Sequence, residues 1–431
     1  PMQLVPSPRG SFGSLVPAPV GLDQLPAGQL GVKVAAVGIN FRDVLNVLGM
    51  YPGDPGAPGS DVAGVVVAGD SISGLRPGQA VFGLTVGALG TAVACSSETV
   101  VAMPPCLSFE AASSMPTVFI TAQMAMGAVT GLRPGERVLV HAAAGGVGLA
   151  ALQVVSAVGA TAVATAGSPS KRSLLRSLGV GAVVGSRDSV FVGPVSCLGG
   201  VDVVLNSLTS PGMVGGSLAV LKQGGRFVEI GKRDIWAPAA VAAERADVSF
   251  SLLAVDFLPG SVVQSALQRV AAGVAAGRLA PLPTVSYSLS AAAAALRQMS
   301  QARHVGKVVV SNSLASQPVH RLGRVLVTGG LGALGSLVAQ WLCGHGVQQL
   351  HLLGRVGKLR AGAVLQQLLG SNASSSQVIV SQCDAGSSED LAAVLNSSRQ
   401  LLPVELIIHA GGVLADATLQ QQQLHGVQQV V

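Results

Sequence analysis

The sequence predicts an α/β protein with a β-rich first part, a doubly wound parallel sheet, and a second, truncated sheet of the same kind. Three observations carry this prediction. Glycine supplies 56 of the 431 residues, only 11% of the residues are charged, and a strand, a glycine-rich turn and a helix follow one another twice, about 185 residues apart. Small residues and alternating strands and helices are typical of parallel sheets covered by helices. Because a domain occupies about 150 residues, the length predicts two or three domains.

The N-terminal part is predicted to consist of strands and loops. Between Leu30 and Gly69 short apolar runs are interrupted by glycine and proline, and YPGDPGAPGS (51–60) contains too many of both for a regular element. From Val118 to Gly131 apolar and small residues follow a helical spacing instead. The change near Pro116 therefore predicts the start of a different architecture.

Strands and helices then alternate along the chain. Short runs of valine, alanine and leucine predict strands, and apolar residues at helical spacing predict helices. The predicted strands are 138–141, 161–164, 182–184, 201–206 and 226–230, and the predicted helices are 145–158 and 171–178. One further helix and a closing strand, 307–310, are expected between residues 261 and 310, and the polar residues 311–317 are predicted to form a linker.

A second unit of this type begins at Arg324. The strand 324–328 is followed by the glycine turn TGGLGALG (328–335), by a helix that reaches Cys343, and by a strand that ends in LLGR at Arg355. This repeat predicts the second parallel sheet.

Composition and charge exclude several classes of protein. The low charged fraction excludes a charged disordered chain and a coiled coil, and glycine does not recur at every third position, as collagen requires. The net charge of +6 is spread thinly, with 20 basic and 15 acidic side chains in residues 1–317 and 6 and 5 in residues 318–431. No nucleic-acid partner is predicted, because such binding needs clustered lysine and arginine. The diffuse positive charge suits an anionic cofactor or an acidic carrier.

One uncharged stretch, 138–170, is long enough to span a bilayer. Its His141, Gln153, Pro169 and glycines favour strand, turn, helix and strand, so no membrane segment is predicted. The first 19 residues lack the features of a signal peptide. Five widely spaced cysteines without a Cys-x-x-Cys pair favour reduced thiols and a cytoplasmic location. Because the chain begins with Pro1, we expect it to be a piece of a longer protein.

The first glycine turn is a candidate for dinucleotide binding. In HAAAGGVGLAAL (141–152) the glycines permit a tight turn and let backbone N–H groups approach a pyrophosphate at the helix N-terminus. A glycine cluster alone is weak evidence, and its place between a predicted strand and a predicted helix supplies the context that such a site requires. The candidate residues are Gly145, Gly146, Val147 and Gly148.

The residues after the next strand indicate which dinucleotide would bind. An NAD enzyme places an acid there to hold the ribose 2′-hydroxyl, whereas this chain has Ser168, Lys171 and Arg172. A hydroxyl and two cations suit a 2′-phosphate, so NADPH is predicted. Alternatively, Lys171 and Arg172 are solvated residues of a helix start, although cations there oppose the helix dipole. Arg187, after the third strand, either supports the phosphate or is solvated.

The second glycine turn repeats the argument. Its candidate residues are Gly329, Leu331, Gly332 and Gly335, and the next strand ends at Arg355 without an acid. The same reasoning again selects the 2′-phosphate of NADPH.

Further motifs accompany the two glycine turns. The first three hundred residues contain, in this order, GINFRDVLNVLGMYPG (38–53), GSDVAGVV (59–66), MPTVFITA (115–122), RPGERVLVHAAAGGVGLAALQ (133–153), VDVVLNSL (201–208) and GGRFVEIGKRDI (224–235). Residues 321–431 contain TGGLGALG, LLGR, CDA (383–385) and LIIHAGGVLADATL (406–419). With the first set, in family order, the first three hundred residues resemble the enoyl reductase domain of polyketide synthases and animal-type fatty acid synthases, a zinc-free branch of the medium-chain dehydrogenases. With the second set, residues 321–431 look like the start of the ketoreductase domain, a short-chain dehydrogenase-like fold, that follows in such synthases.

The resemblance implies a domain organisation. Residues 1–125 and 261–310 would form a GroES-like substrate domain, and residues 126–260 an NADPH-binding Rossmann domain. Residues 311–320 would be a linker, and residues 321–431 a partial ketoreductase with a second, truncated Rossmann-type fold. The Ser, Tyr and Lys that protonate a ketone would lie beyond Val431.

The resemblance also implies an activity, namely NADPH-dependent reduction of the 2,3 double bond of an enoyl thioester bound to an acyl carrier protein. The implied partners are that carrier and the other synthase domains, with a homodimer in the full synthase. Two rival functions stay open. One is a stand-alone zinc-free quinone oxidoreductase, which would end near residue 310, and the other is a non-catalytic relative that keeps the fold as a scaffold or a nucleic-acid-binding protein.

Two residues are candidates for proton delivery. Hydride addition leaves negative charge on the thioester oxygen, which a donor must stabilise. Lys232 follows the strand 226–230 at the carboxyl edge of the sheet, where such folds keep their sites, and the resemblance implicates it together with Asp256. A surface ion pair is the alternative. Family members often have TAYYAL where this chain has TAQMAM (121–126), so an aromatic hydroxyl is missing at position 123 or 124.

Other candidate residues have less specific signals. By resemblance Asn40 and Asp43 lie near the nicotinamide, with loop capping as an equal alternative. Thr121 is a candidate cofactor contact, His141 is expected to be a packed strand residue, and Asp384 is a candidate for an adenine-side contact in the ketoreductase part.

No metal site is predicted. Medium-chain dehydrogenases commonly hold zinc through Cys together with His or Glu. Here Cys95 and Cys106 have no His within ten residues, and the sequence contains no Gly-His-Glu element.

Overall fold

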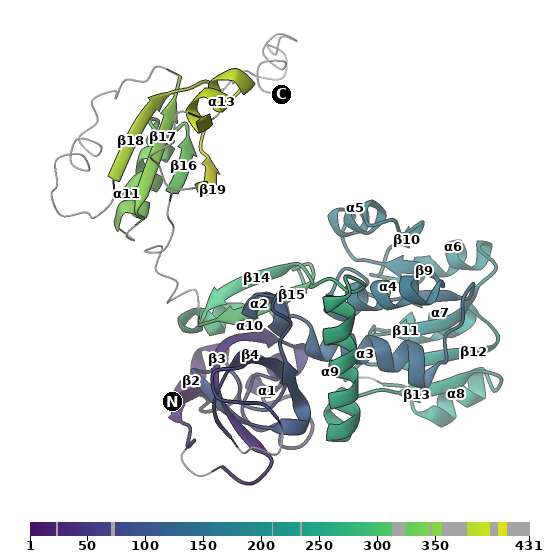
Figure 1. The fold of residues 1–431 in the computed structure, drawn as a ribbon. Coiled ribbons are helices and arrows are strands. Elements are labelled where there is room, and N and C mark those ends of the chain that lie inside the picture. Colours follow the sequence, from purple (N-terminus) through teal and green to yellow (C-terminus); the bar gives the residue numbers. More distant parts are fainter. Residues whose placement is uncertain are drawn as a thin grey trace. The chain divides into compact units, whose positions relative to one another are not determined.

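The computed structural model describes residues 1–22, 25–69, 74–208, 210–232, 235–312, 324–344, 347–355, 377–396 and 404–411. The chain divides into two compact units, Pro1–Leu314 (unit 1) and Ala315–Val431 (unit 2), whose elements are shown in Figure 1.

The first sheet of unit 1 joins strands from both ends of that unit. Its order is β14-β15-β3-β4-β5-β7, with β6 paired to β3. Strand β15 runs antiparallel to β3, so that Val308 lies opposite Ile39. A hairpin of β1 (Met2–Pro6) and β2 (Leu15–Pro19) precedes the sheet. The elements of this part are β3 (Gln29–Ile39), α1 (Phe41–Val47), β4 (Asp61–Gly69), β5 (Ala80–Leu84), β6 (Ala92–Ser96), β7 (Val100–Ala102), α2 (Phe109–Ser113), β14 (Thr284–Ser288), α10 (Ala292–Ser300) and β15 (Lys307–Ser311).

The second sheet has six parallel strands in the order β10-β9-β8-β11-β12-β13. Its central strand β11 (Val201–Asn206) is almost entirely buried, as expected where helices cover both faces. The chain reverses its direction of winding between β8 and β11, and doubly wound folds bind ligands at the carboxyl ends of the strands at such a point. The other elements are β8 (Arg137–Val140), α4 (Gly146–Val158), β9 (Thr161–Thr165), α5 (Pro169–Ser177), β10 (Ala182–Val184), α6 (Val192–Cys197), α7 (Met213–Ala219), β12 (Leu221–Glu229), α8 (Pro238–Glu244) and β13 (Ser249–Leu252).

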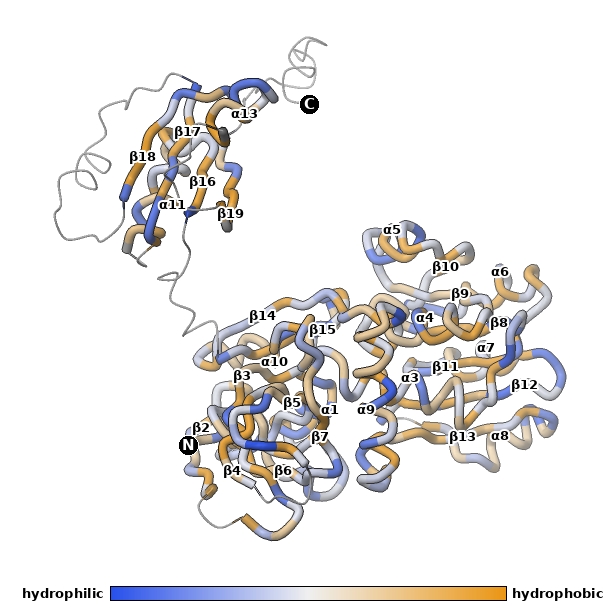
Figure 2. The backbone as a smooth tube through the Cα atoms, in the orientation of Figure 1, coloured by the Kyte–Doolittle hydropathy of each residue, from blue (hydrophilic) through white to orange (hydrophobic). Residues whose placement is uncertain are grey.

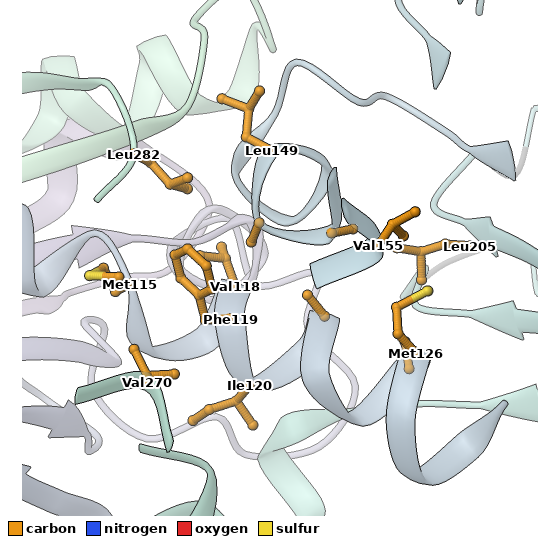
Figure 3. Packing of buried hydrophobic residues seen from close by; sticks show 14 of the residues in the cluster. Met115, Val118, Phe119, Ile120, Met126, Leu149, Val155, Leu205, Val270 and Leu282 are labelled. Atoms are coloured by element: carbon orange, nitrogen blue, oxygen red, sulfur yellow. The ribbon is translucent and has the colours of Figure 1, made fainter. Parts of the chain in front are cut away.

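A shared hydrophobic core connects the two sheets of unit 1. Helix α3 (Pro116–Gln123) packs against α4 and against α9 (Gly260–Ala275). Its Phe119 and Ile120 are fully buried, and Figure 3 shows them among residues from both neighbouring helices. Burying one such side chain contributes about 1.5–3 kcal/mol.

Several elements of unit 1 differ from the prediction. Between residues 261 and 310 the chain forms two helices and two strands, α9, β14, α10 and β15, not one of each. The TVSYS of β14 is half exposed and lacks an apolar run, and the nine residues of α10 are too few to establish a period. Helix α5 begins two residues before Lys171, because Ser168 accepts a hydrogen bond from the Lys171 N–H as the N-cap and Pro169 occupies the first turn.

Unit 2 contains a second parallel sheet in the order β18-β17-β16-β19. Figure 2 shows hydrophobic residues along the strands, and those of β16 and β17 pack against α11. The predicted α/β class with two parallel sheets is therefore confirmed. The elements of unit 2 are β16 (Arg324–Thr328), α11 (Ala333–Gly344), β17 (Gln349–Gly354), β18 (Gln377–Gln382), α13 (Ser388–Asn396) and β19 (Val404–His409). Residues 313–320 of the predicted linker lie outside the described residues.

In the parts of the chain that the structure describes, no helix combines the length and the apolar character needed to cross a membrane.

Candidate active site

Two adjoining cavities meet at the first glycine loop. One has a volume of about 450 Å³ and is lined by the loop, by Thr121 and by residues of both sheet domains. The other has a volume of about 530 Å³ and lies toward β9 and β10. Ala142, Gly145 and Leu208 line both cavities, so a long ligand could extend through the two.

The glycine loop opens at the start of α4. Gly145, Gly146, Val147 and Gly148 all line the first cavity. A Cβ at Gly148 would lie 2.4 Å from the Cα of Ala143, so only glycine fits this close approach of helix and loop. Free N–H groups at helix N-termini can bind anions, and the N-terminus of α4 lies where the two cavities meet.

The second cavity gathers the predicted phosphate-binding residues. Ser168, Lys171 and Arg187 line it. The Lys171 ammonium donates a hydrogen bond to the carbonyl of Ala302 at 2.8 Å, and burial lowers the pKa of this lysine. Arg172 is not among the lining residues, because its guanidinium donates to the carbonyl of Ala166 at 3.1 Å.

Two lining residues of this cavity carry no local sequence signal. Arg303 and His304 reach it from the segment between α10 and β15, more than a hundred residues after the glycine loop. The Nδ1 of His304 is buried and has no hydrogen-bond partner among the described residues. Burial, followed by the charge of Lys171, lowers the pKa of this histidine.

Lys232 and Asp256 lie together at the edge of the first cavity. The Lys232 ammonium donates to Asp256 Oδ2 at 2.8 Å, and both side chains are about one-fifth exposed. Asp256 also accepts hydrogen bonds from Arg42 at 3.0 Å and from the Tyr51 hydroxyl at 2.9 Å. Burial raises the pKa of Asp256, but the hydrogen bond from Lys232 and the charges of Arg42 and Lys232 outweigh it, so the pKa lies below its usual value. Burial and then Asp256 raise the pKa of Tyr51.

Sequence reasoning missed Arg42 and Tyr51. Both lie within GINFRDVLNVLGMYPG, but nothing local indicates that their partner is more than two hundred residues away. An aromatic hydroxyl is thus present beside Asp256, although none occupies position 123 or 124.

The turn that carries Lys232 is held by a buried carboxylate. Glu229, at the end of β12, accepts hydrogen bonds from the Gly231 N–H and from the side-chain amide of Asn206, both at 2.6 Å. Burial raises the pKa of Glu229 despite these bonds.

Asn40 and Asp43 organise the start of α1. Asp43 is buried and accepts hydrogen bonds from the N–H groups of Asn40 and Gly59, each at 2.8 Å. Asp43 therefore caps the N-terminus of α1. Burial raises the pKa of Asp43. Asn40 instead lines the first cavity and bonds to Asp61 at 3.0 Å.

A buried ion pair lies behind this cavity wall. The ammonium of Lys307 is 2.7 Å from Asp61 Oδ2 and also donates to Asn40. Thr117, on α3, donates its hydroxyl and its N–H to Asp61 Oδ1. The exposed fraction is 2% for the Lys307 side chain and 0% for that of Asp61. The network therefore joins β4, β15, α1 and α3 around residues that line the cavity.

His141 directly follows β8, is buried, and is one of the residues that line the first cavity. Its two ring nitrogens bond to the hydroxyls of Thr165 at 3.1 Å and Ser217 at 2.8 Å, and its ring packs edge-on against Phe191. Burial lowers its pKa to about 3.

We predict that His141 makes unit 1 sensitive to acid. Below the ordinary histidine pKa of about 6.5 this histidine is protonated in the unfolded chain but stays neutral in the folded chain. The free energy of unfolding therefore decreases as the pH falls from about 6.5 toward about 3. In His141→Asn the slope of unfolding free energy against pH, measured by urea unfolding between about pH 7 and pH 5, should be smaller than in the unaltered chain. An unchanged slope would contradict this.

In unit 2 the candidate residues gather at one sheet edge. Gly329 has a φ of 68° and its Cβ would lie 2.5 Å from the N of Gly411. The carboxyl ends of β16, β17 and β18 meet at one edge because the strands are parallel. The candidates there are Gly329, Leu331, Gly332 and Gly335 after β16, Arg355 after β17 and Asp384 after β18.

Among the described residues, no three His, Cys, Asp or Glu side chains gather in a way that could hold a metal ion.

Three protein families match successive parts of the chain. Residues 26–107 match the family described as the alcohol dehydrogenase GroES-like domain, residues 178–310 match the zinc-binding dehydrogenases, and residues 323–431 match the KR domain. Together with the glycine loop at the domain junction, these matches define a medium-chain dehydrogenase/reductase followed by ketoreductase sequence.

Similarity to individual proteins identifies the family within this class more narrowly. The chain is 40% identical over 429 residues to the spectinabilin polyketide synthase system protein NorB of Streptomyces orinoci, a match that covers 97% of the chain and 19% of NorB. The crystal structure of CurK enoyl reductase is 39% identical, with a TM-score of 0.68 over 72% of this chain and 98% of that one. The chain therefore belongs to the enoyl reductases of modular polyketide synthases, with a fragment of the following ketoreductase, as the motifs predict. Mycobacterial Rv1454c, solved with NADPH, shares the fold at 24% identity and a TM-score of 0.66, over 72% of this chain and all of its own.

Proposed function

We propose that unit 1 reduces the 2,3 double bond of an enoyl thioester on an acyl carrier protein, with NADPH as the reductant. The observation that carries the proposal is that the Lys232–Asp256 pair lines the same cavity as the glycine loop. A proton donor and a dinucleotide-binding element thus share one space at the carboxyl edge of the sheet. We propose the acyl carrier protein and the other synthase domains as partners, and a homodimer as the state of the full synthase.

The residues present fit NADPH. The N-terminus of α4 suits a pyrophosphate, and the second cavity supplies Ser168, Lys171, Arg187 and Arg303 for a phosphate. The unpartnered Nδ1 of His304 is a further polar atom in that wall. The NADPH-bound relative has the same fold. When bound, NADPH supplies the hydride.

Lys232, Tyr51 and Asp256 act on the negative charge that develops on the thioester oxygen after hydride transfer. The Lys232 ammonium stabilises the enolate oxygen, and Lys232 or the Tyr51 hydroxyl delivers a proton to the α-carbon. Asp256, held ionised by the two cations beside it, accepts hydrogen bonds from both donors and orients them.

The direct test is NADPH oxidation with a crotonyl thioester of pantetheine, with a quinone as the competing substrate. Reduction of the thioester in preference to the quinone is the expected result. Turnover of the quinone alone would identify a quinone oxidoreductase, and turnover of neither would identify a non-catalytic relative.

We expect Lys171→Ala to weaken NADPH binding at least about tenfold and to leave NADH binding nearly unchanged, because one charge-assisted contact contributes roughly 1.5–3 kcal/mol. The measurement is the dissociation constant of each cofactor by calorimetry. Arg176→Ala is the matched control, since Arg176 lies on the same helix and bonds to the Val183 carbonyl away from both cavities. Equal losses for the two cofactors would contradict the phosphate assignment.

Unit 2 is proposed to be the nucleotide-binding part of a ketoreductase. Its glycine loop, Arg355 and Asp384 occupy the edge at which such a sheet binds NADPH. Arg355 is exposed and would meet the 2′-phosphate, and Asp384 the adenine side.

A further inference from the structure

Arg42 links the two sheet domains of unit 1 at the candidate active site. It lies on α1, beside the first sheet, whereas Asp256 lies on a short 3-10 helix, Val255–Phe257, that follows the last strand of the second sheet. Its Nη1 donates to Asp256 Oδ1 at 3.0 Å and its Nη2 to the Pro55 carbonyl at 3.1 Å. The side chain is only 18% exposed.

The contacts of Asp256 are divided between its two oxygens. Arg42 holds Oδ1, while the Tyr51 hydroxyl and the Lys232 ammonium share Oδ2. The Arg42 guanidinium also lies 5.3 Å from the centre of the Tyr51 ring, within cation–π range. One planar group therefore contacts the carboxylate, the tyrosine ring and the loop that carries the tyrosine, a combination that a lysine cannot reproduce.

Buried hydrogen bonds fix the start of α1, the helix that carries Arg42. The first turn of α1 is capped by Asp43, and Asn40 at its start is tied to the buried Asp61–Lys307 pair. The helix therefore cannot shift without breaking buried hydrogen bonds, and Arg42 projects from a fixed base.

We propose that Arg42 is a positioning residue that holds Asp256 against Tyr51 and Lys232 across the domain boundary, so that the proton donors from the two domains assemble on one carboxylate. This inference rests on the proposed reductase function. Arg42 also lines the first cavity, and its two terminal nitrogens donate to Asp256 and to Pro55. The proposed role is to act through the carboxylate rather than on the substrate, and the second test below distinguishes the two.

The first test needs no turnover. The chain has two tyrosines, so Tyr287→Phe leaves Tyr51 as the sole phenol, and ultraviolet absorbance against pH reports its pKa. Burial and Asp256 hold this pKa above its ordinary value. Loss of the stacking guanidinium and of the tie to Pro55 should release Tyr51 to solvent, so Arg42→Gln should lower its pKa toward about 10. An unchanged or higher pKa would overturn the proposal, because removal of a positive charge alone raises it.

The second test separates positioning from direct substrate contact. Arg42→Gln should lower kcat about 10–100-fold with little change in KM, and Arg42→Lys should recover part of the loss. In an Asp256→Asn background Arg42→Gln should cost no more than about threefold further, because both changes break the same unit. Arg42, Tyr51 and Lys232 face Asp256, and the charge of Arg42 lowers the pKa of this carboxylate. In Arg42→Gln the pKa of Asp256 should therefore rise, and the acid limb of the kcat–pH profile should move to higher pH.

Arg245→Gln is the matched control, because Arg245 also pairs with an aspartate, Asp247, and bonds to backbone carbonyls, but lies outside both cavities. It should leave the Tyr51 pKa and the pH profile unchanged. If the kcat losses of Arg42→Gln and Asp256→Asn multiply in the double variant, Arg42 contacts the substrate directly, and the proposal is overturned. A chain that fails to reduce the thioester contradicts the proposed function, and the Tyr51 titration still decides the role of Arg42.

Discussion

Lys232→Ala is expected to slow reduction of the crotonyl thioester about 10²–10⁴-fold, the range that a positioned acid contributes. Lys232 is the ammonium that pairs with Asp256 at the cavity edge, held there by the turn on Glu229. NADPH affinity should barely change, because Lys232 does not line the second cavity, which holds the residues proposed to bind the 2′-phosphate. Steady-state kinetics and the NADPH dissociation constant are the two measurements.

The double variant tests whether the pair acts as one unit. Lys232→Ala combined with Asp256→Ala should cost little more than the worse single change, because groups that act together are not additive. Lys222→Ala is the control, since Lys222 lies on β12, the strand that precedes Lys232, and forms an ion pair with Asp202 at 2.9 Å on the surface. Multiplicative losses would show that the two residues act independently. A double variant with a near-normal rate would show that water or the carrier arm delivers the proton.

The largest loss of stability is expected from Lys307→Met. Removal of the ammonium leaves Asp61 fully buried without its counter-ion, and breaking one side of a buried pair costs about 3–5 kcal/mol. The free energy of unfolding by urea is the measurement. In a Trp341→Phe background Trp236 is the only tryptophan, so its fluorescence follows unit 1 alone.

Two further variants define the cause of that loss. Lys222→Met breaks a surface pair and should cost no more than about 1 kcal/mol. The double variant Lys307→Met with Asp61→Leu should be more stable than Lys307→Met alone, because no buried charge is left unpaired. A Lys307→Met chain as stable as the Lys222→Met chain would show that the buried pair contributes no more than a surface one.

Local patterns were sufficient to predict both parallel sheets and the glycine loops. The strand β11 and helix α4 are mostly apolar, and glycines mark the turns at 145–148 and 329–335. A Cβ at Gly148, Gly329 or Gly335 would lie 2.4, 2.5 or 2.3 Å from a backbone atom, so only glycine fits these three positions. The short, half-exposed strand β14 lacks such a pattern, because an edge strand needs few apolar residues.

The candidate site was only partly predictable. Ser168 and Lys171 follow a strand end, where sequence reasoning can place them, and Lys232 does so as well. Arg303 and His304 line the same second cavity from a distant segment. Arg172, adjacent to Lys171, turns instead to the Ala166 carbonyl, because neighbouring residues on a helix point about 100° apart.

The sequence by itself determined the family, the two sheets, and the strand ends at which a dinucleotide and a proton donor would lie, since these depend on periodicity and on turn chemistry within short segments. Only the tertiary structure decided which side chains meet. It brought Arg42 and Tyr51 from the first sheet domain to Asp256 of the second, and it buried Lys307 against Asp61. The physical reason is that a hydrogen bond or an ion pair between residues more than two hundred positions apart depends on how the sheets pack, and no local pattern records that packing.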